Sequence, residues 1–259
     1  LNTFIPLARE LLIRGHEVTV ITSLDAQKKT IAAGLEFQPI GEDIFPPGSL
    51  KERFTELGKL SGLAALKYTI ELFKDIATSV LRDAPEVIKE NGIEALLVDQ
   101  TSSEGGTVAE FVGIPFITIC SAVVLNRDPD IPPFSTTWKY NPTWSGRLRN
   151  NLGYQILTRI VKPRYDVLKS YRQKWNLPLD SSVNNLYSTL AQVSHQPAEL
   201  EYPRKILPKC FHFTGPYHYS AKREPVAFPW EKLTGQPLIY ASMGTLQNRL
   251  IDVFEKIAS

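Results

Sequence analysis

The sequence predicts an α/β protein in which helices flank a parallel sheet, and three observations support this prediction. Residues 95–98 form a short, unbroken apolar run, which is typical of a strand buried on both faces of a parallel sheet. Residues 101–112 then show helical spacing, and Gly113 suits the left-handed residue that ends a helix. A second apolar run over residues 116–120 follows Pro115. A strand, a helix and a strand joined by short links imply a parallel pair with a right-handed crossover.

Asp99 is the strongest candidate for a catalytic residue, because it directly follows the first of these strands. In parallel sheets, ligands bind beyond the carboxyl ends of the strands. An Asp in that place can hold an imidazole in the tautomer that general-base catalysis needs. The alternative is that Asp99 caps the helix that starts after it, where Thr101 and Glu104 are spaced as a capping box.

The part of the chain before residue 50 alternates helices and strands. Apolar side chains follow helical periodicity from Leu1 onward, and Gly15 ends this helix. Strands are predicted over residues 18–22 and 35–40, with a short helix over residues 26–33 between them. The opening helix lacks the strand and turn that should precede it, so we expect that the amino end of the chain has been cut.

Residues 51–91 are predicted to be helical in at least two pieces, with Pro85 beginning the last piece, where its fixed φ is tolerated. The residues from Leu63 to Phe73 give this stretch a broad apolar face. Packing of that face on the sheet is the favoured interpretation, and contact with a membrane surface is the alternative. No apolar run reaches the roughly 18 residues that a membrane span requires.

Residues 126–144 combine four prolines with several aromatic side chains, which excludes a regular helix or a central strand. Long ordered loops often serve a function. Phe134 and Trp138 could therefore form the wall of a site for an apolar ligand. Packing of the loop onto the body of the protein explains the same residues equally well.

The remainder of the chain is predicted to continue the α/β pattern. Residues 145–176 should be helical with a break at Pro163, and strands should lie at 190–194 and 210–214. A proline-rich, charged segment then suggests a linker between domains. A fresh strand over residues 238–242 leads into Ser242, Met243, Gly244 and Thr245. Backbone amides there could hold an anion such as a phosphate, although the spacing matches neither named phosphate-binding fingerprint.

Composition excludes several classes of function. The 259 residues are 43% hydrophobic and 22% charged, and the net charge of +2 gives no electrostatic case for binding nucleic acid. The two cysteines, Cys120 and Cys210, make no disulfide framework and favour a reducing cytoplasm. Cys210 and His212 lack a second pair to complete a metal site, so no metal is expected. None of the four histidines is predicted to sit at a strand end that opens towards Asp99.

Several motifs together resemble the UDP-sugar glycosyltransferases of the type with two Rossmann domains. The stretch LNTFIPLARELLIRGHEVTVIT resembles the start of these enzymes, and LLVDQTSSEGGTVAEFVGIPFITICSA resembles their internal strand with its Asp, the next helix and the next strand. The stretches AVVLNRDPDIPPFSTTWKYNPTWSGRLRN and LIYASMGTLQN are similar to bacterial zeaxanthin glucosyltransferases. The resemblance covers nearly the whole chain, and the combination of motifs is specific.

The resemblance implies a division into domains and a set of site residues. Residues 1–222 would form a Rossmann-like, acceptor-binding domain without its first strand, residues 223–237 a linker, and residues 238–259 the start of a UDP-sugar-binding domain. Asp99 would orient a catalytic His that the family places immediately before Leu1. The remaining candidate residues are Asn2, Phe134 and Trp138 for the acceptor, and Ser242, Gly244 and Thr245 for the donor.

The implied reaction is the inverting transfer of a hexose, with glucose expected, from a UDP-sugar to a hydroxyl of a hydrophobic acceptor such as a carotenoid. The UDP-sugar is a co-substrate, and no cofactor or metal is expected. The expected location is cytoplasmic, with at most peripheral contact with the inner face of a membrane. Without the His and most of the donor site, the 259 residues alone should show little transferase activity. A non-catalytic ligand-binding module of the same fold, or a macrolide- or flavonoid-type acceptor, is the alternative.

Overall fold

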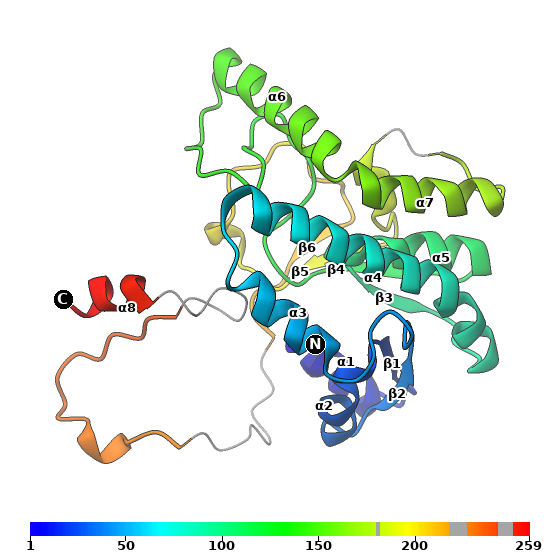
Figure 1. Cartoon of the computed structure of the whole chain (residues 1–259), viewed down its shortest axis with the longest axis horizontal. Helices are drawn as coiled ribbons and strands as arrows, with labels where there is room; N and C mark the ends of the chain where they lie inside the picture. Colours follow the sequence, from blue (N-terminus) through cyan, green and yellow to red (C-terminus); the bar gives the residue numbers. More distant parts are fainter. Residues whose placement is uncertain (180–181, 218–226, 243–250) are drawn as a thin grey trace.

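The computed structural model describes residues 1–179, 182–217, 227–242 and 251–259, which form parallel strands flanked by helices (Figure 1). The α-helices in chain order are α1 (Phe4–Ile13), α2 (Gln27–Ala32), α3 (Ser49–Leu57), α4 (Gly62–Glu90), α5 (Glu104–Val112), α6 (Trp144–Ile160), α7 (Lys162–Lys174) and α8 (Ile251–Ala258). The strands are β1 (Thr19–Thr22), β2 (Glu36–Pro39), β3 (Leu96–Asp99), β4 (Phe116–Cys120), β5 (Gln192–Ser194) and β6 (Phe211–Phe213). Short 3-10 helices are η1 (Leu24–Ala26), η2 (Gln100–Ser102), η3 (Val183–Leu186), η4 (Ala198–Leu200) and η5 (Trp230–Lys232).

Within the described residues, the strands form two parallel ladders. One ladder joins β1 to β2, and the other has the order β3-β4-β5-β6. Asp99 pairs with Ile119, and Thr118 of the same strand β4 pairs with Gln192 of β5. Because all four strands of the larger ladder run in the same direction, the residues that follow β3, β4 and β5 emerge at one edge. This confirms the predicted fold class and places Asp99 at that edge.

Three helices, α4, α5 and α7, pack together beside the larger ladder and form the main core (Figure 1). Its buried residues are Leu81, Ala84, Ile88, Val108, Leu168 and Leu186. Each large apolar side chain buried in this way contributes about 1.5–3 kcal/mol. The buried residues of α4 run from Leu72 to Ile88, whereas Leu63 near its start is 84% exposed. The face from Leu63 to Phe73 was expected to pack on the sheet, but Leu63 is exposed, and from Leu72 onward α4 packs mainly against α5 and α7.

Two local predictions were wrong. Pro85 lies inside α4 instead of starting a new helix, because Leu81 and Ile88 are buried on either side of it and hold the helix together where one backbone donor is missing. Residues 238–242 form no strand, since every described residue from 227 to 242 is exposed and none is paired with another strand. A lone strand has no partner for its backbone groups. The break at Pro163 is confirmed, since α6 ends at Ile160 and Pro163 occupies the first turn of α7.

Candidate active site

Asp99 ends β3 with its carboxylate held by three hydrogen bonds. Oδ1 accepts from the backbone N–H of Thr101 at 2.8 Å and from the Thr101 hydroxyl at 2.6 Å. Oδ2 accepts from the hydroxyl of Ser121 at 2.5 Å. A carboxylate offers about four acceptor positions, so one position on Oδ2 remains open among the described residues. Asp99 is half-buried, and its side chain is therefore fixed while still reachable from solvent.

The alternative role foreseen for Asp99, a helix cap, is realised as well. Asp99 is the N-cap of η2, and α5 begins only at Glu104. The capping box expected between Thr101 and Glu104 is wrong, because the Thr101 hydroxyl binds Asp99 and the Glu104 carboxylate is buried against Arg164. Arg164 also donates to the Thr101 carbonyl at 2.6 Å. An ion pair from α7 thus anchors the turn that carries Asp99.

A histidine does lie at the edge that carries Asp99, contrary to the expectation from sequence. His195 directly follows β5, and its Nε2 lies 2.9 Å from the carbonyl oxygen of Ser121. Ser121 therefore contacts both groups, Asp99 through its hydroxyl and His195 through its carbonyl. A strand was predicted over residues 190–194, but its weak pattern did not show that it pairs with β4.

Three buried amide side chains form a ladder across the strand ends. Gln100 donates to Asn126 at 2.8 Å, and Asn126 donates to Gln192 at 2.9 Å. Gln192 in turn donates to the Ser188 carbonyl at 2.9 Å. All three side chains are at most 3% exposed, so each lost bond would leave a buried polar group without a partner. The ladder fixes the start of the loop after β4. The pattern of hydrophobic residues in the sequence did not predict these amide contacts.

Cys120 lies beside this arrangement and is chemically inert. It is fully buried in β4, and burial, with a smaller effect from the negative charge of Asp99, raises the pKa of its thiol to about 12. A thiol with such a pKa stays protonated near neutral pH and is a poor nucleophile. Cys120 is thus a free thiol in the core of the sheet.

The loop from Asn126 to Thr143 packs partly onto α6. Trp138 is half-buried and lies so close to Gly153 that a Cβ there would come within 2.8 Å of its ring. The Arg149 guanidinium lies 5.0 Å from the centre of the same ring. Phe134 is 61% exposed. Among the described residues no hydrogen bond or ring contact joins Phe134 or Trp138 to Asp99, so their role as acceptor contacts stays a prediction.

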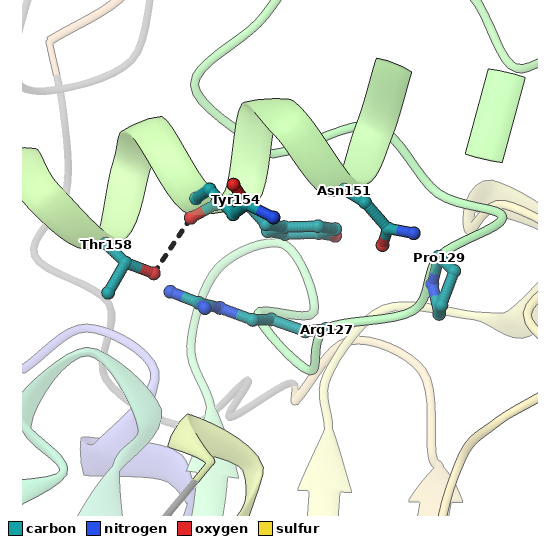
Figure 2. Close-up of a pocket in the computed structure, with 6 residues that line it drawn as sticks. Arg127, Pro129, Asn151, Tyr154 and Thr158 are labelled. Atoms are coloured by element: carbon teal, nitrogen blue, oxygen red, sulfur yellow. Dashed lines mark hydrogen bonds between the residues drawn. The ribbon is translucent and has the colours of Figure 1, made fainter. Parts of the chain in front are cut away.

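A cavity of about 330 Å³ lies between this loop and α6 (Figure 2). It is lined by Arg127, Pro129, Asn151, Tyr154, Gln155 and Thr158. The Arg127 guanidinium lies 5.4 Å from the centre of the Tyr154 ring and extends towards Thr158 (Figure 2). Burial raises the pKa of the Tyr154 phenol, which therefore remains a neutral hydrogen-bonding group. The cavity offers one cation, one aromatic face and amide groups.

The other candidate residues occupy three places. Asn2 is exposed and accepts a hydrogen bond from Lys29. The backbone nitrogen of its neighbour Leu1 lies within electrostatic reach of the Asp99 carboxylate. Ser242 is exposed, whereas Gly244 and Thr245 lie outside the described residues. The structure thus brings the start of the chain to Asp99 and leaves the predicted donor contacts untested.

Two features are absent from the described ranges. No group of three or more His, Cys, Asp or Glu side chains is arranged to hold a metal ion. No helix in the described part of the chain has the length and apolarity needed to cross a membrane.

Comparison with known proteins gives the class of protein to which the chain is similar, the glycosyltransferases. The chain is 31% identical over 252 residues to a zeaxanthin glucosyltransferase of Pantoea ananas, and 29% identical over 256 residues to one of Pseudescherichia vulneris. Each match covers 97% of this chain, and 58% and 59% of the respective relatives. The chain therefore spans about three fifths of the length of these relatives. No protein-family model matches it.

A solved structure supports the same fold. The glycosyltransferase of kitacinnamycin superposes with a TM-score of 0.60 at 19% identity, covering 89% of this chain and 52% of the other. At this identity the likeness shows the fold alone. The resemblance inferred from the motifs is confirmed, since relatives along almost the whole chain are glycosyltransferases.

Proposed function

We propose that this chain is the acceptor-side part of an inverting glycosyltransferase that moves glucose from a UDP-sugar to a hydroxyl of a hydrophobic acceptor such as a carotenoid. The similarity to two zeaxanthin glucosyltransferases supports the acceptor and the sugar. The observation that carries the mechanism is the Asp99 carboxylate, which keeps one open acceptor position at the sheet edge next to Leu1. The domain boundaries and the cytoplasmic location belong to this proposal.

In the proposed reaction Asp99 is a positioning residue. An imidazole N–H that donates to the open position on Oδ2 leaves the other ring nitrogen unprotonated and ready to accept a proton. The resemblance expects this His immediately before Leu1, the residue that the structure brings near Asp99. The imidazole removes the proton from the acceptor hydroxyl, the oxygen attacks the anomeric carbon, and UDP leaves from the opposite face. General-base catalysis of this kind contributes about 10²–10⁴-fold.

His195 is the second imidazole to consider, and its contacts assign it a different role. Its Nε2 lies at the Ser121 carbonyl, so a hydrogen bond there takes the N–H away from Asp99. His195 therefore supports the conformation of Ser121, and no carboxylate among the described residues holds it. Replacement of His195 with Gln should lower activity much less than replacement of Asp99.

The test is Asp99→Asn in the full-length protein, assayed with UDP-glucose and zeaxanthin. Asn keeps one oxygen for the two donors of Thr101, and its NH2 group takes the place of Oδ2, where the Ser121 hydroxyl can accept from it. The imidazole then loses both its acceptor and the charge that stabilises an imidazolium, so kcat should fall about 10²–10⁴-fold while the melting temperature changes little. Asp166→Asn, at an exposed carboxylate paired with Lys162, is the matched control and should keep full activity.

Two outcomes would contradict the proposal. Wild-type kcat in the Asp99→Asn variant would remove Asp99 from the mechanism, and an α-linked product from α-linked UDP-glucose would exclude inversion. Binding of the carotenoid without any turnover by the full-length protein would favour the non-catalytic binding module.

A further inference from the structure

The outward face of α6 carries an apolar stripe that the described residues leave uncovered. Four large side chains recur at every fourth position, which places them along one side of the helix. They are Trp144, Leu148, Leu152 and Ile156, with exposures of 78%, 54%, 51% and 54%. The buried residues of α6 are Gly146, Asn150, Gly153 and Leu157, on the opposite side. In Figure 1, α6 lies at the margin of the molecule, beyond the layer of α4, α5 and α7.

Residues 131–165, which include α6 and its flanks, carry a positive charge. They contain six Lys or Arg and no Asp or Glu. Three of these cations, Arg147, Lys162 and Arg164, form ion pairs with Asp130, Asp166 and Glu104, which lie outside this range. Arg149 contacts the Trp138 ring, the Lys139 carbonyl and the Asn150 side chain, all of which are uncharged. Arg159 is exposed on the last turn of α6, and neither it nor Arg149 has a carboxylate within ion-pair distance in the described part of the chain.

We propose that this face of α6 docks on an anionic lipid surface, with the helix lying in the plane of the membrane interface. An amphipathic helix binds there through its buried apolar area and through attraction of its cations to lipid headgroups. Trp144 suits the boundary between headgroups and acyl chains, since its ring is amphipathic. Arg149 and Arg159 can bury their stems while their guanidinium groups reach phosphate. Repulsion from carboxylates is absent within residues 131–165.

This location differs from the membrane contact considered for α4. Leu72, Ala77, Leu81, Ala84 and Ile88 of α4 are buried and cannot also face lipid. Leu63 alone remains highly exposed near the start of α4. Leu63→Asp in α4 and Leu152→Asp in α6 make the same chemical change on the two helices, so together they show which helix contacts lipid.

The experiment is vesicle co-sedimentation of the full-length protein, with vesicles of phosphatidylcholine alone or mixed with an equal part of phosphatidylglycerol. Binding should require the anionic lipid and weaken at high salt, because salt screens the attraction. Leu152→Asp should weaken binding at least about tenfold, since it removes an apolar side chain that the lipid would bury and adds an anion. Arg159→Gln should weaken it about fivefold. Leu63→Asp should bind like the wild type.

A second measurement follows Trp144 directly. Its fluorescence should shift to the blue when anionic vesicles are added, and Trp144→Phe should abolish this shift while leaving the remaining tryptophans unchanged. The readouts need no catalysis, so their failure is distinct from a failure of the proposed reaction.

Several results would overturn the proposal. Unchanged vesicle binding by Leu152→Asp, or loss of binding in Leu63→Asp instead, would exclude the α6 face. A dimer in sedimentation velocity without lipid that Leu152→Asp converts to a monomer would assign the face to a second copy. A marked fall in melting temperature in Leu152→Asp would show that another part of the full-length protein covers it.

Discussion

Ser121 donates its hydroxyl to Asp99 across the ends of two neighbouring strands, at a distance of 2.5 Å. The bond links the first residue after β4 to the last residue of β3 and fixes the orientation of the carboxylate. Ser121→Ala should lower the free energy of unfolding by about 0.5–1.5 kcal/mol, the usual net contribution of such a bond. Denaturant unfolding measures this, with Ser135→Ala, an exposed loop hydroxyl, as the control. Equal effects of the two changes would show that the bond contributes nothing.

The ion pair between Arg164 and Glu104 should be sensitive to the loss of one partner. Glu104 is 1% exposed in its side chain, and Arg164 bonds both of its carboxylate oxygens. Arg164→Met leaves that carboxylate buried and unpaired, so the free energy of unfolding should fall by about 3–5 kcal/mol. The double variant with Glu104→Gln should recover much of the loss.

Lys162→Met is the matched control for this prediction, because Lys162 and Asp166 form an exposed pair on the same helix. Its effect should stay within about 1 kcal/mol. If Arg164→Met were no more destabilising than Lys162→Met, the buried pair would not anchor the turn at Asp99.

The two cysteines should differ sharply in reactivity. Cys120 is buried and its pKa is raised to about 12, so at pH 8 it is almost entirely protonated. Cys210 is half-buried. Brief treatment with iodoacetamide should therefore modify Cys210 alone, whereas both should react after denaturation; peptide mass spectrometry counts each. Labelling of native Cys120 as fast as Cys210 would contradict the burial of β4.

The carboxylate of Asp83 should make stability depend on pH. The hydrogen bonds from Arg82, and a smaller contribution from the Gly41 N–H, lower the pKa of Asp83 in the folded protein. A lowered folded pKa contributes stability above the unfolded value of about 3.9 and loses it as pH falls towards the folded pKa. Asp83→Asn should therefore be less stable than the wild type at pH 7, and the difference should shrink below about pH 4. A difference that grew on acidification would contradict this sign.

Gly41 supports the same corner of the fold through its backbone. Its φ of +69° is left-handed, and an added Cβ would come within 2.6 Å of the Ser79 Cβ in α4. Gly41→Ala should thus lower the free energy of unfolding by more than about 1 kcal/mol, the usual difference between Ala and Gly in a helix. Gly34→Ala is a useful control, since Gly34 has φ of +75° and no atom near its Cβ position. Equal decreases in melting temperature in both variants would show that the left-handed backbone conformation alone causes the loss of stability, and that the contact with Ser79 adds nothing.

Local patterns in the sequence were sufficient for the elements whose residues are neighbours in the chain. The run before Asp99, the helix after it and Gly113 with φ of +81° specify one strand–helix–strand unit, and the structure has it. The predicted break between two helices at Pro163 was also correct, because a proline restricts the backbone of its immediate neighbours. The prediction that Pro85 begins a new helix was wrong, because burial of the residues on both sides outweighs the intrinsic cost of an internal proline. Such burial is not visible in a local pattern.

Contacts between distant residues were beyond the sequence. Ser121 and His195 meet only because β5 pairs with β4, and the short β5 carries a weak pattern. The amide ladder of Gln100, Asn126 and Gln192 was missed since buried polar residues oppose the rule by which a core is predicted. The aromatic loop was interpreted either as an apolar wall or as a segment packed onto the body, and neither interpretation anticipated that its buried side chains include the carboxylates of Asp128 and Asp130.

The pairing of Thr118 with Gln192 has a consequence for synthesis of the protein. The helices α6 and α7 and the segment after them must all leave the ribosome before β4 gains its second neighbour. At about 5–20 residues per second, that interval lasts several seconds. During this time one side of β4 presents unpaired backbone groups, which are a template for wrong pairing with other chains. Docking of β5 on β4 ends this exposure.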